Sequence, residues 1–187
     1  VSILQEADPG VVQPDDSLAS SIPVSREELF EFDVVIFGDV NPQLLGSSVM
    51  ENLRAFVSER GGGIVFLAGP RHNPTAYQDS PLESLFPFRL ETVQRPQNPQ
   101  PGEDGRAIQL SFQGGQVSHL MLSNDPEKSA RLWQSMPSLH WLLQVDHLRD
   151  GTRVLVEQPV VGRDPLPVVL MHFFGAGKVL FHASDES

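Results

Sequence analysis

The sequence has 187 residues, of which 40% are hydrophobic, and it contains no cysteine. A chain of this length can form one domain with its own core, and the lack of cysteine excludes disulfides, thiolate metal sites and a cysteine nucleophile. The formal net charge of −11, with the basic residues scattered singly, argues against nucleic acid and anionic membrane surfaces as partners.

The start of the chain predicts a strand followed by a loop. Val1–Leu4 (VSIL) reads as a short strand, while Gln5–Ile22 is largely polar and holds Pro9, Gly10 and Pro14. Because the sequence opens in a strand and without Met, we expect it to be a piece of a longer polypeptide. It contains no apolar run of the roughly 20 residues that a transmembrane helix needs, which describes this piece and not its parent.

A βαβ unit is predicted next. The apolar runs Val34–Phe37 and Ile64–Ala68 are typical of strands that are buried on both faces. Between them we expect a helix over Ser47–Arg60, which Gly61 would end. Its buried face is indicated by apolar residues at spacings of three and four, namely Leu45, Val49, Leu53, Phe56 and Val57. A helix that joins two such strands predicts that they are parallel.

Shorter elements surround this unit. Ser25 and Glu28 have the spacing of a capping box, and Asp125-Pro126 is a good start for a helix over Glu127–Ser135. Gln94–Arg106 has no apolar residue and three prolines, so we expect a mobile loop there. The remaining predicted strands are Ala107–Phe112, Arg153–Gln158, Leu166–Phe174 and Lys178–His182, the last two forming an antiparallel hairpin around Gly175-Ala176-Gly177.

Several phrases of the chain resemble one known family. They are FDVVIFGDVNPQLL, ENLRAFVSERGGGIVFLAGP and AYQDSPLESLFPF in the centre, with SARLWQSMPSLHW and LPVVLMHFFGAGKVLFHASDES towards the end. In this order they resemble the class I glutamine-amidotransferase-like domain of large bacterial membrane proteins that also carry von Willebrand factor A domains. With VSILQEADPG at the start, the resemblance extends over nearly the whole chain.

The resemblance implies a fold and a setting. The fold would be a single α/β domain of the flavodoxin-like, class I amidotransferase-like type, with a mainly parallel sheet flanked by helices and a C-terminal antiparallel hairpin. The setting would be a soluble domain of a membrane-anchored bacterial protein. Its partners would be other domains of the same parent, including the von Willebrand factor A-like ones. The side of the membrane and the oligomeric state stay open.

The chemistry of the family would need a nucleophile that this chain lacks. Class I amidotransferases place a Cys on the tight turn after a strand, and here the strand Ile64–Ala68 leads into Gly69-Pro70. Neither a Cys nor a Ser in a G-x-S-x-G elbow is present, so the acyl-enzyme cannot form in the usual way. Pro70 also has no N–H to offer an oxyanion. The sequence therefore predicts no catalytic residue and no cofactor, as in a pseudoenzyme.

A candidate ligand site follows the two central strands. The ligand crevice of open α/β sheets lies outside the carboxyl ends of parallel strands, so the polar residues there could bind a small polar ligand. These residues are Asp39, Asn41, Arg71, His72 and Asn73. The alternative is structural: Asp39 and Asn41 would cap the following helix, and Arg71 would form an ion pair or lie in solvent.

Histidines elsewhere are weaker candidates. His182, with Asp185 and Glu186 after it, has the composition of an oriented general base. Without a nucleophile or metal partner, we favour a strand-end histidine and a polar tail. His140 and His147 do not match a metal-binding spacing, so we predict no metal site.

Three functions remain open at this point. The first is a non-catalytic glutamine-amidotransferase-like binding or interaction domain of a larger membrane-anchored protein. The second is a hydrolase or carbohydrate-active relative of the same fold that uses Asp39, His72 or His182 at the strand ends. The third is a structural spacer. The lack of a nucleophile favours the first.

Overall fold

The computed structural model describes residues 25–96 and 105–185, so the predicted strand Val1–Leu4 lies outside the described residues. It has one six-stranded sheet in the order β1-β2-β6-β5-β4-β3. The strands are β1 (Val34–Phe37), β2 (Gly63–Leu67), β3 (Gln109–Leu110), β4 (Arg153–Gln158), β5 (Leu166–Phe174) and β6 (Gly177–His182). The α-helices are α1 (Arg26–Phe30), α2 (Pro42–Ala55) and α3 (Pro126–Gln134).

The sheet is mixed, with a parallel half and an antiparallel half. β1, β2 and β6 are parallel neighbours, whereas β5, β4 and β3 continue the sheet in antiparallel pairs. The prediction of a mainly parallel sheet was therefore right only for the half that contains the βαβ unit. Short connections explain the antiparallel pairs β4–β5 and β5–β6, which are joined by residues 159–165 and 175–176, whereas β3 pairs with β4 across the long segment 111–152. The C-terminal hairpin of β5 and β6 is confirmed.

Helix α2 connects β1 to β2 and starts earlier than expected. Asn41 is its N-cap and Pro42 its first residue, so a short helical piece precedes the predicted start, and the longer piece begins at Ser47, as predicted. Gly46 interrupts the helix with a positive φ of 74°. After α2 the chain makes one π-helical turn, η1 (Phe56–Arg60), and Gly61 ends it in the left-handed conformation, as predicted.

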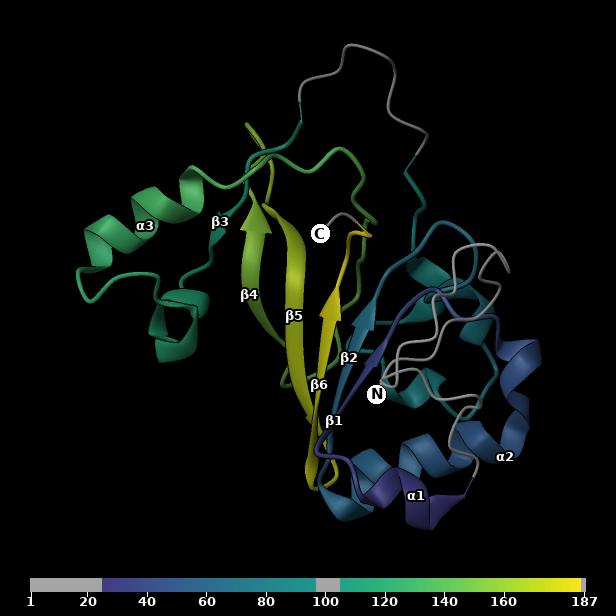
Figure 1. Cartoon of the computed structure of the whole chain (residues 1–187). Helices are drawn as coiled ribbons and strands as arrows, with labels where there is room; N and C mark the ends of the chain where they lie inside the picture. Colours follow the sequence, from purple (N-terminus) through teal and green to yellow (C-terminus); the bar gives the residue numbers. More distant parts are fainter. Residues whose placement is uncertain (1–24, 97–104, 186–187) are drawn as a thin grey trace, which may run out of the picture.

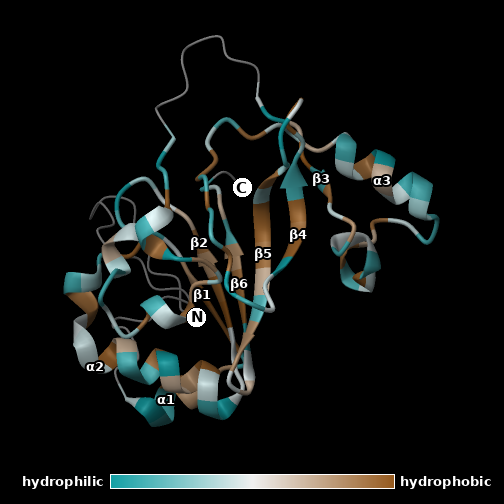
Figure 2. Ribbon diagram, turned by 180° about the vertical axis from the view of Figure 1, so that it is seen from behind, coloured by the Kyte–Doolittle hydropathy of each residue, from teal (hydrophilic) through white to brown (hydrophobic). Residues whose placement is uncertain are grey.

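The core lies between α2 and the sheet. Leu53 and Phe56 are buried on the helical side, and Ile64 and Phe181 are buried on the strands. Aromatic rings fill the space under the short 3₁₀ turns that follow β2: Phe37, Phe66, Tyr77, Phe86, Phe88 and Phe181. Figures 1 and 2 show α1 and α2 beside the β1 half, and the strands as the most hydrophobic part of the ribbon.

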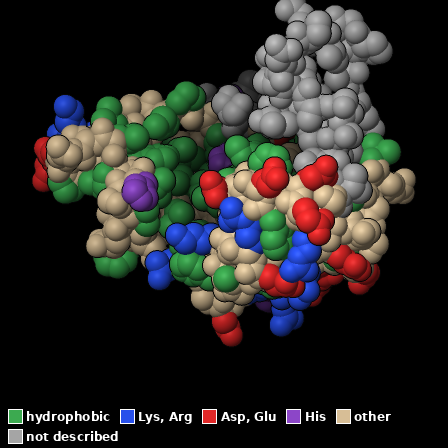
Figure 3. Space-filling model, turned by 60° about the horizontal axis from the view of Figure 1, so that its bottom comes forward, with side chains coloured by type: hydrophobic (Ala, Val, Ile, Leu, Met, Phe, Trp, Pro, Cys, Tyr) green, Lys and Arg blue, Asp and Glu red, His purple; other side chains and the backbone are tan. Residues whose placement is uncertain are grey.

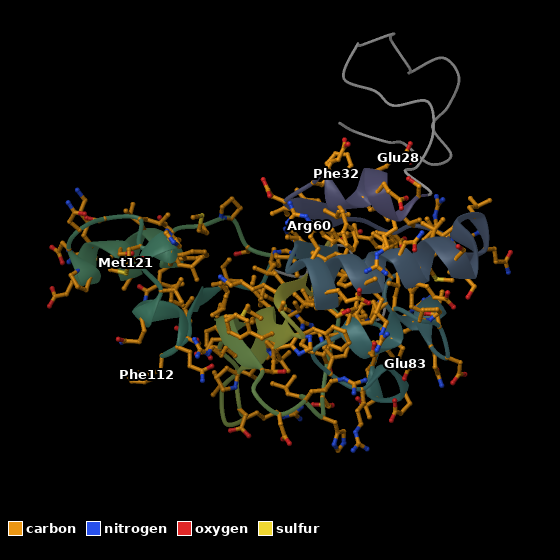
Figure 4. The ribbon with its side chains drawn as sticks, turned by 90° about the horizontal axis from the view of Figure 1, so that it is seen from below. Glu28, Phe32, Arg60, Glu83, Phe112 and Met121 are labelled. Atoms are coloured by element: carbon orange, nitrogen blue, oxygen red, sulfur yellow. The ribbon has the colours of Figure 1, made fainter. Side chains whose placement is uncertain are left out.

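Residues 111–135, from the end of β3 to the end of α3, form an arm, whereas residues 139–150 return to the body of the molecule, where the N–H of Leu143 donates to the carbonyl of Ala183 at 2.8 Å. The arm stands beside β3, away from α1 and α2 (Figure 1). Figure 3 shows hydrophobic side chains gathered between this arm, on the left, and the rest of the molecule. Phe112 projects from the arm (Figure 4) and is 86% exposed, because β3 ends at Leu110 and not at Phe112 as predicted.

Both ends of the loop predicted over Gln94–Arg106 form backbone hydrogen bonds in the structure. The N–H of Gln94 donates to the carbonyl of Gln144 at 2.9 Å, and the N–H of Arg106 donates to Leu139 at 2.7 Å. Both ends are therefore tied to the segment before β4, and residues 97–104 lie outside the described residues. Among the helices of the described ranges, none is long and apolar enough to cross a membrane.

Candidate functional site

The carboxyl ends of the three parallel strands meet at one edge of the sheet. Phe37 of β1 is in register with Phe66 of β2, and Phe66 with Phe181 of β6. The N–H of Ala68 then donates to the carbonyl of His182 at 2.8 Å, just beyond β2. The segments that leave these strands therefore lie side by side, as the sequence predicted for the first two.

Asp39 is the centre of this edge. One oxygen of its carboxylate accepts the N–H groups of His72 and Asn73 at 2.7 and 2.6 Å. The other oxygen accepts the N–H of Arg71 at 2.9 Å. The carboxylate thus joins the exit of β1 to residues 71–73, the loop after β2. It does not cap α2, so that part of the structural alternative was wrong.

Gly69 makes room for this carboxylate. A Cβ atom built on Gly69 would lie 2.1 Å from Cγ of Asp39 and 2.3 Å from its Cβ, far inside van der Waals contact. The N–H of Gly69 also donates to the carbonyl of Asn73 at 2.9 Å, which closes the loop on itself. A residue without a side chain is therefore required where the two strand exits approach each other.

Asn73 is fully buried and holds both strands. Its Nδ2 donates to the carbonyl of Leu67 at 2.6 Å and to that of Gly38 at 3.3 Å. Its Oδ1 is buried and has no hydrogen-bond partner within the residues that the structure describes. Asn73 is thus a structural link between β1 and β2 that also presents one unmatched acceptor.

Arg71 and His72 contribute their main chains to the edge. Besides the two N–H groups given to Asp39, the carbonyl of Arg71 accepts a hydrogen bond from the guanidinium of Arg95 at 3.1 Å. Arg95 also donates to the carbonyl of Pro70 at 3.2 Å and to the hydroxyl of Thr75. The side chain of Arg71 is exposed, whereas His72 is half-buried.

Asn41 caps helix α2 at the same edge. Its Oδ1 accepts the N–H of Gln43 at 3.0 Å, the helix-capping role that the structural alternative gave it. The neighbouring carbonyl of Val40 accepts the hydroxyl of Tyr77 at 2.6 Å. Burial raises the pKa of this phenol, and the nearby charge of Asp39 raises it further, so Tyr77 remains a neutral donor.

The exit of β6 is also held by internal bonds. A ring nitrogen of His182, Nδ1, lies 2.8 Å from the carbonyl of Ser184, and the hydroxyl of Ser184 donates to the carbonyl of Trp141 at 2.7 Å. Asp185 is exposed, and Glu186 lies outside the described residues. Across residues 25–96 and 105–185, no three His, Cys, Asp or Glu side chains are grouped so as to hold a metal ion.

These contacts define what the edge can do chemically. A carboxylate offers about four acceptor positions, and three backbone N–H groups already use most of those of Asp39. Asp39 is therefore poorly placed to take a proton from a substrate. Of the site residues predicted from sequence, Asp39 is hydrogen-bonded to the main chains of Arg71, His72 and Asn73, and Asn41 caps α2, so their polar groups are largely satisfied within the protein.

Sequence reasoning missed three polar residues. Arg95 was placed in a mobile loop, and Tyr77 in a long connection, so neither carried a signal. His172 is buried in β5, and its Nε2 donates to the carbonyl of Leu85 at 2.7 Å. A polar residue at an inward position of the apolar run LPVVLMHFF was the signal that could have singled it out.

Comparison with known proteins supports the fold alone. No family model and no curated protein sequence matches the chain. A cytoplasmic protein of Salmonella typhimurium LT2 superposes with a TM-score of 0.57 at 19% identity, over 89% of this chain and 66% of that one. A second Salmonella typhimurium cytoplasmic protein gives a TM-score of 0.60 at 16% identity, over 89% and 65%.

A β-galactosidase from Rahnella sp. R3 is similar over a small part of its length. It superposes with a TM-score of 0.50 at 17% identity, over 83% of this chain but 20% of the enzyme. The chain spans about two thirds of the two Salmonella proteins. At these identities the chain shares a mixed α/β fold with its structural neighbours, and the likeness extends no further.

Proposed function

We propose that this chain is a non-catalytic binding or interaction domain of the flavodoxin-like, glutamine-amidotransferase-like type, within a larger membrane-anchored bacterial protein. The observation that carries the proposal is the internal use of Asp39. At the edge where an enzyme of this type would place its reacting groups, the carboxylate accepts hydrogen bonds from the main-chain N–H groups of residues 71–73. The turn after β2 also supplies no nucleophile.

Exposed apolar side chains support an interaction role. Ile36 and Val34 on the edge strand β1 are 70% and 54% exposed, and Phe112 stands out from the arm. Exposed apolar patches on a protein surface mark interaction sites, protein–protein contacts among them. The partners that fit this proposal are other domains of the same parent protein, with von Willebrand factor A-like domains among them.

The alternative, a hydrolase or carbohydrate-active relative, receives less support. It requires an available carboxylate or imidazole at the strand ends. Asp39 is held by three amides, and the ring of His182 contacts the carbonyl of Ser184. The likeness to a β-galactosidase concerns the fold and carries no active-site residue to this chain.

Ammonia release from glutamine tests the non-catalytic part of the proposal. The wild-type chain and the variant His182→Ala should both give no turnover above the buffer blank, because no residue after β2 can form the acyl-enzyme. A class I amidotransferase with its cysteine serves as the positive control. Turnover by the wild type that disappears in His182→Ala would overturn the proposal and favour the hydrolase.

The interaction part needs the parent protein. The chain and its neighbouring domains, produced as separate polypeptides, should bind each other in a titration followed by light scattering. Ile36→Ser and Phe112→Ser change exposed side chains, so both should keep the wild-type melting temperature. At least one of them should weaken the complex. Equal affinity for wild type and both variants would exclude these surfaces as the contact.

A further inference from the structure

Residues 71–73 hold three consecutive N–H groups that converge on one carboxylate. Consecutive main-chain N–H groups that point into one concavity form an anion-binding nest, and the carboxylate of Asp39 is its occupant here. We propose that residues 71–73 are a preformed binding site for a small carboxylate, that the chain fills this site with its own Asp39, and that a free carboxylate binds there once the side chain is removed.

The nest is held in shape by bonds that do not involve Asp39. Nδ2 of Asn73 donates to the carbonyl of Leu67, and the N–H of Gly69 donates to the carbonyl of Asn73. The N–H of Ala76 donates to the carbonyl of His72 at 2.8 Å. On the other side, Arg95 binds the carbonyls of residues 70 and 71. Removing the carboxylate therefore leaves the three donors in place.

The space and the charge both suit a carboxylate. A Cβ atom on Gly69 would overlap Cγ and Cβ of Asp39. The carboxylate therefore occupies a space beside the N–H groups that is free only because residue 69 has no side chain. Two oxygens of one planar group accept the three bonds. The guanidinium of Arg95 adds positive charge behind the loop, and N–H bonds to a charged acceptor are the stronger kind.

The intact chain should not bind such an anion. Asp39 is attached to the same fold, so its effective concentration at the nest exceeds that of any free carboxylate. The strand-end edge is consequently closed to anionic ligands in the wild type. This inference concerns the edge alone and does not depend on whether the domain is an interaction module.

Rescue of an Asp39 variant by formate tests the proposal. Asp39→Gly removes the whole side chain and so leaves a space beside the three N–H groups that is large enough for a formate ion. Its melting temperature should be well below that of the wild type in chloride. Replacing chloride by formate at constant ionic strength should raise it along a saturating binding curve, as a ligand that binds only the folded state does. The wild type should not respond in this way.

Asn41→Ala is the matched control. It lies at the same edge and also loses a hydrogen bond to a main-chain N–H, the one from Gln43, but it leaves the nest occupied. Formate should therefore raise its melting temperature no more than that of the wild type. An equal response of Asn41→Ala and Asp39→Gly would mean a general salt effect and would overturn the proposal.

A second readout locates the anion. In Asp39→Gly, formate should shift the amide proton resonances of residues 71, 72 and 73, because these protons donate to it. If Asp39→Gly is unfolded in chloride, Asp39→Ala is used, and formate should restore its folded spectrum. Absence of both the thermal response and the amide shifts in a folded variant, or failure of formate to refold either variant, would overturn the proposal.

Discussion

Asp39 and Gly69 lie at an edge where α/β sheets commonly bind ligands, but in this protein they stabilise the fold. The carboxylate lies where ligands bind in open α/β sheets, yet its partners are the main-chain N–H groups of the adjacent loop. Each charge-assisted bond of this kind contributes about 1.5–3 kcal/mol when it is shielded from water. The strand exits are therefore held by the side chains of Asp39 and Asn73, both of which the sequence had marked as candidates for a ligand site.

Gly69→Ala tests the space that this arrangement needs. The new Cβ would collide with the Asp39 carboxylate, so the variant should lose about 2–4 kcal/mol of unfolding free energy in urea. Gly38→Ala is the control, because a Cβ there meets nothing within 4 Å. It should stay within about 1 kcal/mol of the wild type. Equal effects of the two substitutions would show that Asp39 is not packed against Gly69.

His172 predicts a dependence of stability on pH. Burial lowers its pKa and the charge of Arg149 lowers it further, although the hydrogen bond to Leu85 acts in the opposite direction. The unfolded chain, with a histidine pKa of about 6.5, then binds more protons than the folded one. The stability due to neutral His172 is full above about pH 6.5 and is lost as the pH falls towards the lower pKa of the folded state.

Urea denaturation of the wild type and His172→Gln measures this effect. Between about pH 7.5 and about pH 5.5 the wild type should lose more unfolding free energy than the variant, because Gln keeps a donor for Leu85 but does not titrate. The difference between the two proteins is the quantity to compare, because every other ionisable group is the same in both. Parallel curves would contradict the assignment of a lowered pKa to His172.

Helix α2 illustrates how a few residues set the start and the buried face of a secondary-structure element. Its start depends on Asn41 and Pro42 and its place on the face that carries Leu53, and Gly61 ends the π-helical turn that follows it. Leu53 is 3% exposed, whereas Leu44 on the same helix is 56% exposed. The same residue type therefore has two environments within one helix, which allows a direct test of the buried face.

Leu53→Ala should lower the unfolding free energy by about 2–5 kcal/mol, because it removes a buried side chain and leaves a cavity. Leu44→Ala should change it by less than about 0.5 kcal/mol, since the side chain is mostly in water already. Thermal denaturation of both variants checks the pair. A larger loss for Leu44→Ala would mean that the wrong face of α2 has been placed against the sheet.

The whole molecule depends on contacts between segments that are distant in the sequence. Gln94 and Arg106 pair with the segment before β4, and Arg95 holds the loop after β2. Residues 97–104, between these contacts, carry no aliphatic or aromatic side chain other than proline and lie outside the described residues. The ends of the segment that we expect to be replaceable, residues 97–104, are therefore set by these contacts and not by composition alone.

Two loop replacements separate the contacts from the stretch between them. A short Gly/Ser linker in place of residues 97–104 should keep cooperative unfolding, with a change of about 0.6 kcal/mol for each halving of loop length. Extending the replacement to residues 94–106 should cost about 1–3 kcal/mol more, because it removes the bonds of Arg95. Thermal unfolding of both proteins decides. Equal stability would show that Arg95 does not brace the edge.

The sequence by itself determined the local elements of this protein. Apolar periodicity, caps and turn glycines are encoded within a few residues, so the strands of the βαβ unit, the C-terminal hairpin, the left-handed Gly61 and the missing nucleophile were all readable in advance. Only the tertiary structure decided that half of the sheet is antiparallel and that Asp39 binds residues 71–73. Such contacts join residues some 30 positions apart in the chain, for example His72 and Asp39. No local sequence pattern therefore indicates which carboxylate will accept a hydrogen bond from which N–H. That pairing follows from the register of β1 on β2, which the burial of Phe37, Ile64 and Phe66 on one face of the sheet fixes in space.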